Sequence, residues 1–116
     1  MLRAIATAVV TSVALAACGG GHEVRLVVEL AGEARATDLQ LRVGDDTRFY
    51  ETRAHGEAIV ERDVPEETRV TFRARNGGDG GELVLRAFVD GCEVESQSCE
   101  GAGCVGFLEI TVRGGC

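Results

Sequence analysis

The sequence predicts an all-β fold, an antiparallel β-sandwich of seven to eight strands after a short N-terminal leader. Apolar side chains recur at every second position between residues 23 and 113. Clusters of Gly, Asp and Asn separate these runs at intervals of about 8–12 residues, and no run shows the helical period. Short alternating strands at this spacing are typical of a β-sandwich. A small barrel gives the same pattern and ranks second.

We expect strands at Glu23–Ala31, Thr37–Val43, Arg48–Arg53, Glu57–Val64, Thr68–Arg75, Glu82–Val89, Cys92–Gln97 and Val105–Arg113. The first alternates apolar residues such as Val24 and Leu26 with charged ones such as Arg25, as a half-buried strand does. The second repeats this alternation, and the third carries two aromatic residues, Phe49 and Tyr50. The fourth has the least regular pattern of the eight.

Pro65 ends the fourth segment, because proline has no N–H to donate to a strand ladder. The fifth strand alternates cleanly, with Phe72 on its inward side. The sixth is apolar on both faces, with Val84 and Phe88 on the second, and this favours a central strand covered on both sides. Asp90-Gly91 is a strong hairpin signal that leads into the seventh strand.

Residues 1–17 are predicted to be a cleavable signal peptide. Met1-Leu2-Arg3 is a minimal positive start, and Ala4–Ala17 is apolar or small throughout. The run is too short for a stable membrane-spanning helix, which needs about 20 apolar residues. A buried core helix is disfavoured because residues of this kind all round it leave no polar face for solvent.

The stretch Leu15-Ala16-Ala17-Cys18 resembles the lipobox of bacterial lipoproteins. The resemblance implies cleavage before Cys18 and attachment of a diacylglyceryl group, usually with a third acyl chain, to that residue. Two or more chains anchor firmly, since each buried methylene adds about 0.8 kcal/mol. Gly19, in place of the Asp that retains some members in the inner membrane, implies the outer membrane if the host has one. A plain secretory signal is the alternative.

On this interpretation residues 18–22 are a lipid-anchored, glycine-rich tether and residues 23–116 are the sandwich domain. The segment Gly19–His22 spans only about 15 Å when extended, so the domain would sit close to the bilayer. After removal of Arg3 with the leader, 11 Arg face 19 Asp and Glu, a net charge of −8. This acidic balance disfavours nucleic acid and anionic headgroups as partners.

The four remaining cysteines are Cys92, Cys99, Cys104 and Cys116. An even number in an exported chain predicts two disulfides. A strand between Cys104 and Cys116 would hold them about 25 Å apart. That is too far for a disulfide, so this pairing and the complementary Cys92–Cys99 are disfavoured.

Two pairings remain open. The favoured one joins Cys99 to Cys104 and Cys92 to Cys116, in a hairpin formed by the last two strands. The other joins Cys92 to Cys104 and Cys99 to Cys116. A zinc site is disfavoured, because the spacing lacks paired C-x2-C knuckles and export favours oxidation.

The segment Val64–Phe72, followed by Asp90-Gly91, resembles the late strands of immunoglobulin-like or transthyretin-like bacterial surface domains. In those families the turn usually reads Pro-x-Gly-x-Tyr, whereas Glu67 and Arg69 occupy the Gly and aromatic positions here. The resemblance implies the same kind of sandwich.

We expect no catalytic site, metal site or cofactor. His22 in the tether and His55 beside a turn glycine are both predicted to be solvated, and no nucleophile accompanies them. The loop carboxylates of Asp45-Asp46 and Gly77–Gly81 lack the number and spacing of Ca²⁺ ligands. They are interpreted, like Glu66-Glu67, as acidic turns.

Arg69, Arg73 and Arg75 share one predicted exposed face, and the same pattern makes Arg86 a candidate neighbour. Such a stripe would suit an anionic polymer. A solvated sheet face paired with cross-strand Glu is the more common arrangement.

The sequence therefore favours a non-catalytic binding or structural module, anchored to a membrane through its N-terminal lipid, with an envelope protein or polysaccharide as partner. One alternative is an inhibitor-type or accessory lipoprotein that contacts a partner enzyme through the Cys99–Cys104 loop. Another is a small envelope hydrolase subunit, which would need a cleft with converging acidic and His side chains. An exposed apolar patch at Phe107, Phe88 or Tyr50 would favour a protein partner.

Overall fold

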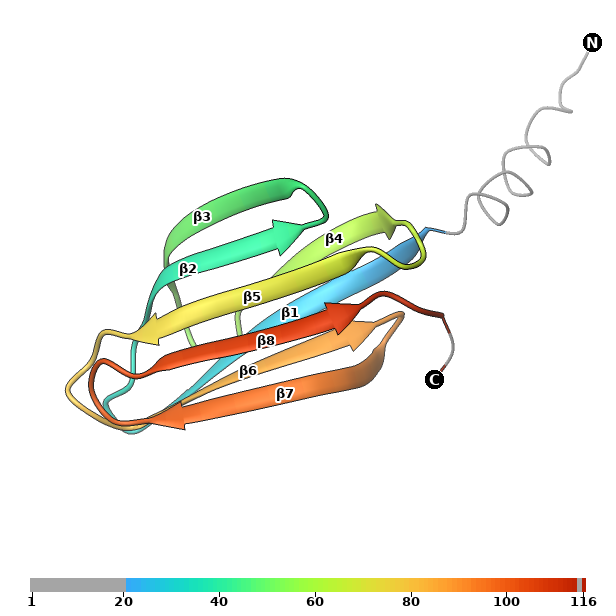
Figure 1. Cartoon of the computed structure of the whole chain (residues 1–116). Helices are drawn as coiled ribbons and strands as arrows, with labels where there is room; N and C mark the ends of the chain where they lie inside the picture. Colours follow the sequence, from blue (N-terminus) through green and yellow to red (C-terminus); the bar gives the residue numbers. More distant parts are fainter. Residues whose placement is uncertain (1–20, 115) are drawn as a thin grey trace, which may run out of the picture.

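The computed structural model describes residues 21–114 and 116, which form two four-stranded sheets packed face to face (Figure 1). The strands are β1 (His22–Ala31), β2 (Ala36–Val43), β3 (Asp46–Arg53), β4 (Ala58–Val64), β5 (Arg69–Asn76), β6 (Glu82–Val89), β7 (Cys92–Glu100) and β8 (Val105–Thr111). Their order is β4-β1-β6-β7 in one sheet and β3-β2-β5-β8 in the other, and all pairs are antiparallel. The predicted all-β sandwich is confirmed. The barrel is wrong, because the strands divide into two separate sheets.

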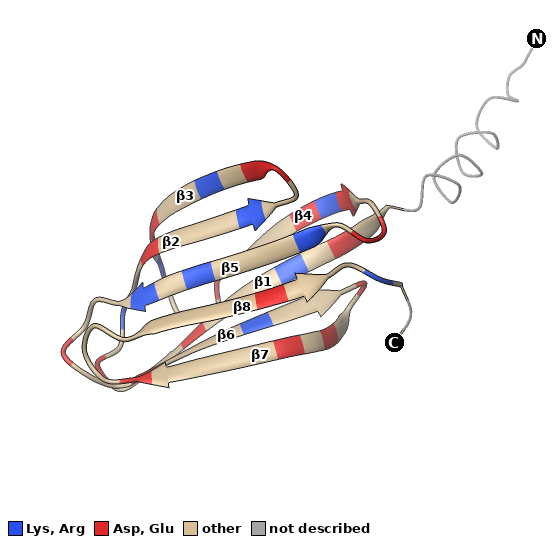
Figure 2. Ribbon diagram, in the orientation of Figure 1, with Lys and Arg blue, Asp and Glu red and all other residues tan. Residues whose placement is uncertain are grey.

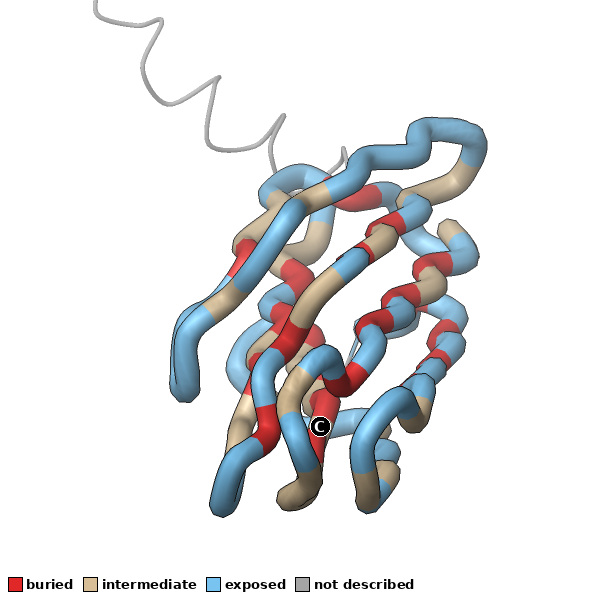
Figure 3. The backbone as a smooth tube through the Cα atoms, turned by 90° about the vertical axis from the view of Figure 1, so that its left-hand side faces the viewer, coloured by how far each residue is buried: buried red, intermediate tan, exposed pale blue. Residues whose placement is uncertain are grey.

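The core lies between the sheets and is built by the alternation that the sequence shows. β5, β6 and β8 bury every second residue and expose or half-bury the others, which Figure 3 shows as bands of red along the tube. Phe72 is the largest fully buried side chain. Around it lie Val24, Leu26, Val28, Leu39, Leu41, Val70, Leu83, Leu85, Leu108, Ile110 and Val112.

β6 is a central strand, as predicted, since it pairs with β1 on one side and β7 on the other. The link to β7 is the two-residue turn Asp90-Gly91, whose φ angles are 51° and 86°. Positive φ at both positions defines a type I′ turn, whose twist matches that of the flanking strands. Among the described residues no helix is long and apolar enough to cross a membrane.

The folded domain begins one residue earlier than predicted. His22 is the first residue of β1 and pairs with Val64 of β4, so it does not belong to a free tether. Its side chain is also not solvated, because only 14% of it is exposed. The reason is two carboxylates, described below, that come from turns distant in the sequence.

The predicted hairpin between the last two strands is wrong. β7 pairs with β6, whereas β8 pairs with β5 in the opposite sheet. β7 is a polar edge strand on which most residues are exposed. β8 buries Leu108 and Ile110 and completes the second sheet. The link between them therefore crosses from one sheet to the other at the edge of the sandwich.

The strand order differs from that of an immunoglobulin constant-type sandwich, in which the first two strands share a sheet. Here β1 and β2 lie in opposite sheets, and so do β3 and β4. A contact between the side chains of Arg48 on β3 and Glu61 on β4 bridges the two sheets at that edge. The opposite edge, at β7 and β8, is bridged by the two disulfides.

Candidate functional site

The outer face of the β3-β2-β5-β8 sheet carries a row of four side chains, one from each strand. Gln40 lies opposite Phe49 on one side and opposite Arg73 on the other, and Arg73 lies opposite Phe107. Directly opposed residues of antiparallel strands point to the same face. The row therefore has an aromatic ring at each end and an amide and a guanidinium between them. We call Phe49, Gln40, Arg73 and Phe107 the aromatic row.

Both rings of the aromatic row are open to solvent. Phe49 is 75% exposed and Phe107 is 50% exposed. Val105, on the same face of β8, is 43% exposed. Three of the four large exposed apolar side chains in the described part of the chain thus lie on this face, and the fourth is Val94 on β7. This face therefore exposes apolar side chains that are not part of the core.

Two surface hollows lie against the aromatic row and share Gln40. The first has a volume of about 570 Å³ and is lined by Gln40, Arg42, Gly44, Asp45, Arg69, Thr71, Phe107 and Glu109. The second has a volume of about 520 Å³ and is lined by Asp38, Leu39, Gln40, Phe49, Tyr50, Glu51 and Arg73. Neither is lined by a histidine, so the acidic and His cleft that a hydrolase subunit would need is not found at these hollows.

The arginines on this face differ in their partners. The Nε atom of Arg69 lies 3.2 Å from a carboxylate oxygen of Glu109. Arg42 donates from Nε to the carbonyl oxygen of Gly44 at 3.0 Å. Arg73 and Arg75 have no carboxylate within ion-pair distance among residues 21–114 and 116. Figure 2 shows blue bands, which mark arginine, along β5.

The outer face of the β4-β1-β6-β7 sheet is different, because several of its charges are paired. Arg86 contacts Glu29 at 2.9 Å and Glu93 at 3.0 Å. The prediction of Arg86 as a neighbour of the β5 arginines is therefore wrong, since β6 belongs to the other sheet. Phe88 is half-buried on this face. The aromatic surface open to a ligand is thus on the β3-β2-β5-β8 sheet.

Of the three residues proposed to mark an apolar patch, only Phe107 is strongly exposed. Tyr50 is half-buried, and its ring lies 4.7 Å from the guanidinium carbon of Arg53. Phe49 was not singled out as a ligand contact. The strand pattern contained a signal for both rings: they occupy positions on the polar side of their strands.

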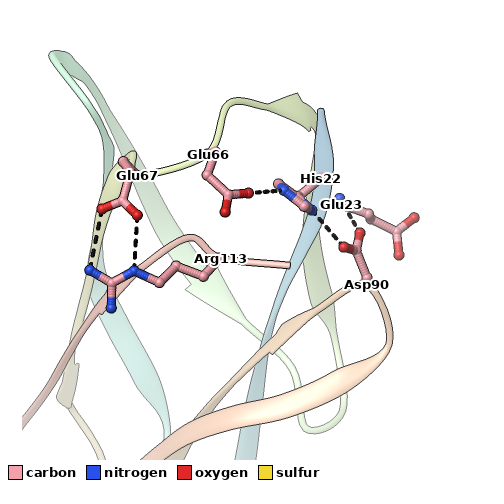
Figure 4. A network of polar contacts seen from close by, with 6 residues as sticks. All are labelled: His22, Glu23, Glu66, Glu67, Asp90 and Arg113. Carbon is pink, nitrogen blue, oxygen red and sulfur yellow. Dashed lines mark hydrogen bonds and ion pairs between the residues drawn. The ribbon is translucent and has the colours of Figure 1, made fainter. Parts of the chain in front are cut away.

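A second polar cluster lies at the end of the sandwich where β1 begins (Figure 4). The two ring nitrogens of His22 contact different carboxylates, with Nδ1 2.6 Å from Asp90 and Nε2 2.6 Å from Glu66. The other oxygen of Asp90 accepts the backbone N–H of Glu23 at 2.9 Å. His22 therefore connects the first strand to the β4–β5 turn and to the β6–β7 turn.

The contacts of His22 determine its charge. Hydrogen bonds to Asp90 and then to Glu66 raise the pKa of the imidazole above its ordinary value. The N–H of Glu23 and then His22 lower the pKa of Asp90. Beside this cluster Arg113 binds both oxygens of Glu67, at 3.0 and 3.2 Å, and lowers the pKa of that carboxyl. Both ring nitrogens of His22 contact carboxylates from two different turns, so the cluster acts as a clamp between these segments.

The structure joins Cys92 to Cys116 and Cys99 to Cys104, with Cα–Cα distances of 5.6 and 6.0 Å. This is the favoured of the two pairings that the sequence leaves open. Each disulfide connects one end of β7 in one sheet to a segment that flanks β8 in the other sheet. The proximity of Cys92 to Cys116 thus arises from two facing edge strands, not from a hairpin.

Asn76 fixes the loop that contains the second disulfide. It is fully buried. Its Oδ1 accepts the N–H groups of Arg35 and Gly78 at 3.1 and 2.9 Å, and its Nδ2 donates to the carbonyls of Gly80 and Gly101 at 3.0 and 3.1 Å. All hydrogen-bonding capacity of the amide is used between three connecting segments. Asn76 is the last residue of β5 and lies one position beyond the predicted strand Thr68–Arg75, so the strand pattern did not predict this role.

The other residues considered as ligands do not converge. His55 is exposed and accepts the backbone N–H of Leu30 at 2.9 Å. Across the described ranges no group of three or more His, Cys, Asp or Glu side chains is arranged to hold a metal ion. Cys18, the predicted lipidation site, and the residues of the leader lie outside the described residues.

No protein-family model matches the chain, and no curated protein is significantly similar to it.

Proposed function

We propose that this protein is a lipid-anchored module of a bacterial cell envelope that binds a partner through the outer face of its β3-β2-β5-β8 sheet and does not catalyse a reaction. The observation that carries the proposal is the aromatic row. It leaves Phe49 and Phe107 exposed at 75% and 50% on a face where Arg73 and Arg75 lack carboxylate partners among the described residues. An exposed apolar surface rimmed by polar residues is typical of an interaction site.

The anchor rests on the lipobox-like stretch Leu15-Ala16-Ala17-Cys18. The strand β1 starts at His22, four residues after Cys18. This short link would hold the domain at the surface of the bilayer, on the outer membrane if the host has one. The resemblance of the Val64–Phe72 segment to transthyretin-like bacterial surface domains fits the same location.

The absence of catalysis is supported by the surroundings of the two histidines. The ring nitrogens of His22 contact two carboxylates, and Nδ1 of His55 accepts a backbone N–H. A nucleophile needs a base within hydrogen-bonding distance, and neither histidine has such a partner in these contacts.

Two measurements test the proposal in cells. Radiolabelled palmitate is expected to enter the wild-type protein and not the Cys18→Ala variant, and the variant is expected to leave the membrane fraction. For the binding face, a photo-crosslinking amino acid at position 107 is expected to give a defined product. The same amino acid at position 94, an exposed apolar site on β7, serves as the matched control.

Equal crosslinking at positions 107 and 94, or none at 107, would contradict the binding face. Palmitate incorporation into the Cys18→Ala variant at the wild-type level would contradict the anchor. Because the two measurements are independent, each part of the proposal stands or fails separately.

A further inference from the structure

We infer that the ligand of the aromatic row is an acidic polysaccharide, lying across the four strands from Phe49 to Phe107. This inference rests on the proposed function, since it names the partner of the same face. It is argued from three features of the row: the spacing of its rings, the groups between them, and its charge.

The spacing of the two rings favours an extended ligand. Phe49 and Phe107 lie on the two edge strands of the sheet, three strand intervals apart. Neighbouring strands are about 4.8 Å apart, so the rings are separated by about 14 Å. They cannot touch each other or one small ligand group. A ligand that uses both rings must extend across the sheet.

The groups between the rings are polar. Gln40 offers an acceptor and two donors, and Arg73 offers five donors. A protein hot spot usually has a contiguous apolar centre with polar groups around it. Here the order is reversed, with apolar ends and a polar middle. Sugar rings have apolar C–H faces that stack on aromatic rings and hydroxyls that bond amides, and a polysaccharide repeats both along its length.

The unpaired guanidinium groups favour acidic sugars over neutral ones. Arg73 and Arg75 have no ion-pair partner among the described residues. An arginine fork binds a carboxylate or sulfate through two parallel hydrogen bonds. The hollows beside the row are also lined by Asp38, Glu51 and Glu109. These carboxylates would repel a polymer as densely charged as nucleic acid, so the ligand has its charges spaced out.

The test uses the acylated mature protein in detergent and electrophoresis through gels that contain a polysaccharide. The probes are hyaluronate, which carries a carboxylate on every second sugar, polygalacturonate, which carries one on every sugar, and uncharged dextran. We expect retardation by at least one acidic probe and not by dextran. The mature chain has a net charge of −8, so its net charge repels the acidic probes and cannot by itself cause retardation.

The variants locate the binding. Phe107→Ala, Phe49→Ala and Arg73→Gln are each expected to raise the dissociation constant obtained from the retardation about tenfold, which corresponds to about 1.4 kcal/mol. Arg73→Lys should bind more weakly than wild type because it keeps the charge and loses the fork. Val94→Ala and Arg25→Ala are the matched controls. Arg25 is an exposed arginine on the other sheet with no ion pair among the described residues.

Retardation by dextran as strong as that by the acidic probes would overturn the inference that the ligand is acidic. A loss in Arg25→Ala equal to that in Arg73→Gln would overturn the location. If no acidic probe retards the protein while position 107 still crosslinks in cells, the polysaccharide is excluded and the binding face of the proposed function stands. If position 107 also fails to crosslink, the proposed function fails with it.

Discussion

Cys92 and Cys116 lie 5.6 Å apart at their Cα atoms although they lie at the ends of strands in opposite sheets. Cys92 begins β7 at the edge of the first sheet, and Cys116 follows β8 at the edge of the second. Cys99 and Cys104 make the same connection at the other end of these strands. The two disulfides therefore close one side of the sandwich at both ends.

The two disulfides should differ in their effect on stability. Cys92 and Cys116 are 24 positions apart, and Cys99 and Cys104 are 5 apart. If a disulfide stabilises mainly by lowering the entropy of the unfolded chain, removing the one that closes the longer loop lowers the free energy of unfolding by about 3.5 kcal/mol. Removing the one that closes the shorter loop lowers it by about 2 kcal/mol. Denaturant unfolding of the double variants Cys92→Ser/Cys116→Ser and Cys99→Ser/Cys104→Ser measures both. A larger loss for the shorter loop would show that the enthalpy of the folded loop dominates instead.

Asn76→Ala should destabilise the domain by about 3 kcal/mol. The substitution leaves two N–H groups and two carbonyls without their partner, and each unsatisfied buried group costs roughly 1–3 kcal/mol before water compensates. Gln97→Ala is the matched control, because it removes an exposed amide from β7. Unfolding free energies of the two variants check the prediction, and an equal loss in both would mean that water replaces the Asn76 side chain fully.

Asn76→Asp separates the two halves of this network. The carboxylate still accepts from Arg35 and Gly78, but it faces the carbonyls of Gly80 and Gly101 that the amide donated to. We expect the variant to be less stable than wild type at pH 7 and to recover part of the loss as the pH falls and the carboxyl becomes a donor. Stability that stays constant with pH relative to wild type would contradict this assignment of the amide orientation.

The strands could be predicted from the sequence because a period of two determines which residues face the core. All eight predicted strands are present, with ends that differ by at most three residues. The pairing of β7 could not be predicted in this way. Alternation identifies the inward face of a strand but not its neighbour, so a polar strand such as Cys92–Glu100 fits the edge of either sheet.

The site was harder to predict than the fold for the same reason. The aromatic row depends on the register of three strand pairs, and its residues are spread along the sequence from Gln40 on β2 to Phe107 on β8. The partners of His22 lie 44 and 68 positions away. No local pattern records such contacts. The disulfides were easier, because the length of the predicted strand between Cys104 and Cys116 disfavoured one of the three pairings.

Stability should depend on pH through His22 and Asp90. The pKa of His22 is raised in the folded state, so its contribution is complete below the unfolded value of about 6.5 and is lost as the pH rises through the folded pKa. The pKa of Asp90 is lowered, so its contribution is complete above about 3.9 and is lost as the pH falls through the folded pKa. The clamp therefore stabilises most between these limits.

The His22→Gln variant tests the upper limit. Between pH 5 and pH 9 the difference in unfolding free energy between wild type and this variant should shrink as the pH rises. Glu66 and Asp90 face the imidazole directly, and the Glu67–Arg113 pair lies beside them (Figure 4). His55→Gln is the control, because that histidine accepts only a backbone N–H in the described contacts. A difference that is constant with pH would show that His22 acts through packing alone.

Phe107→Ala and Phe49→Ala should leave the stability of the domain almost unchanged, whereas Phe72→Ala should reduce it by about 3–5 kcal/mol. Phe72 is fully buried, so its removal leaves a cavity in the core. Phe107 and Phe49 keep half or more of their surface in water, and exposed substitutions usually change stability by about 0.5 kcal/mol or less. Denaturant unfolding of the three variants makes the comparison. A large loss for Phe107→Ala would assign that ring to the fold, and the aromatic row would then have no surplus surface with which to bind a ligand.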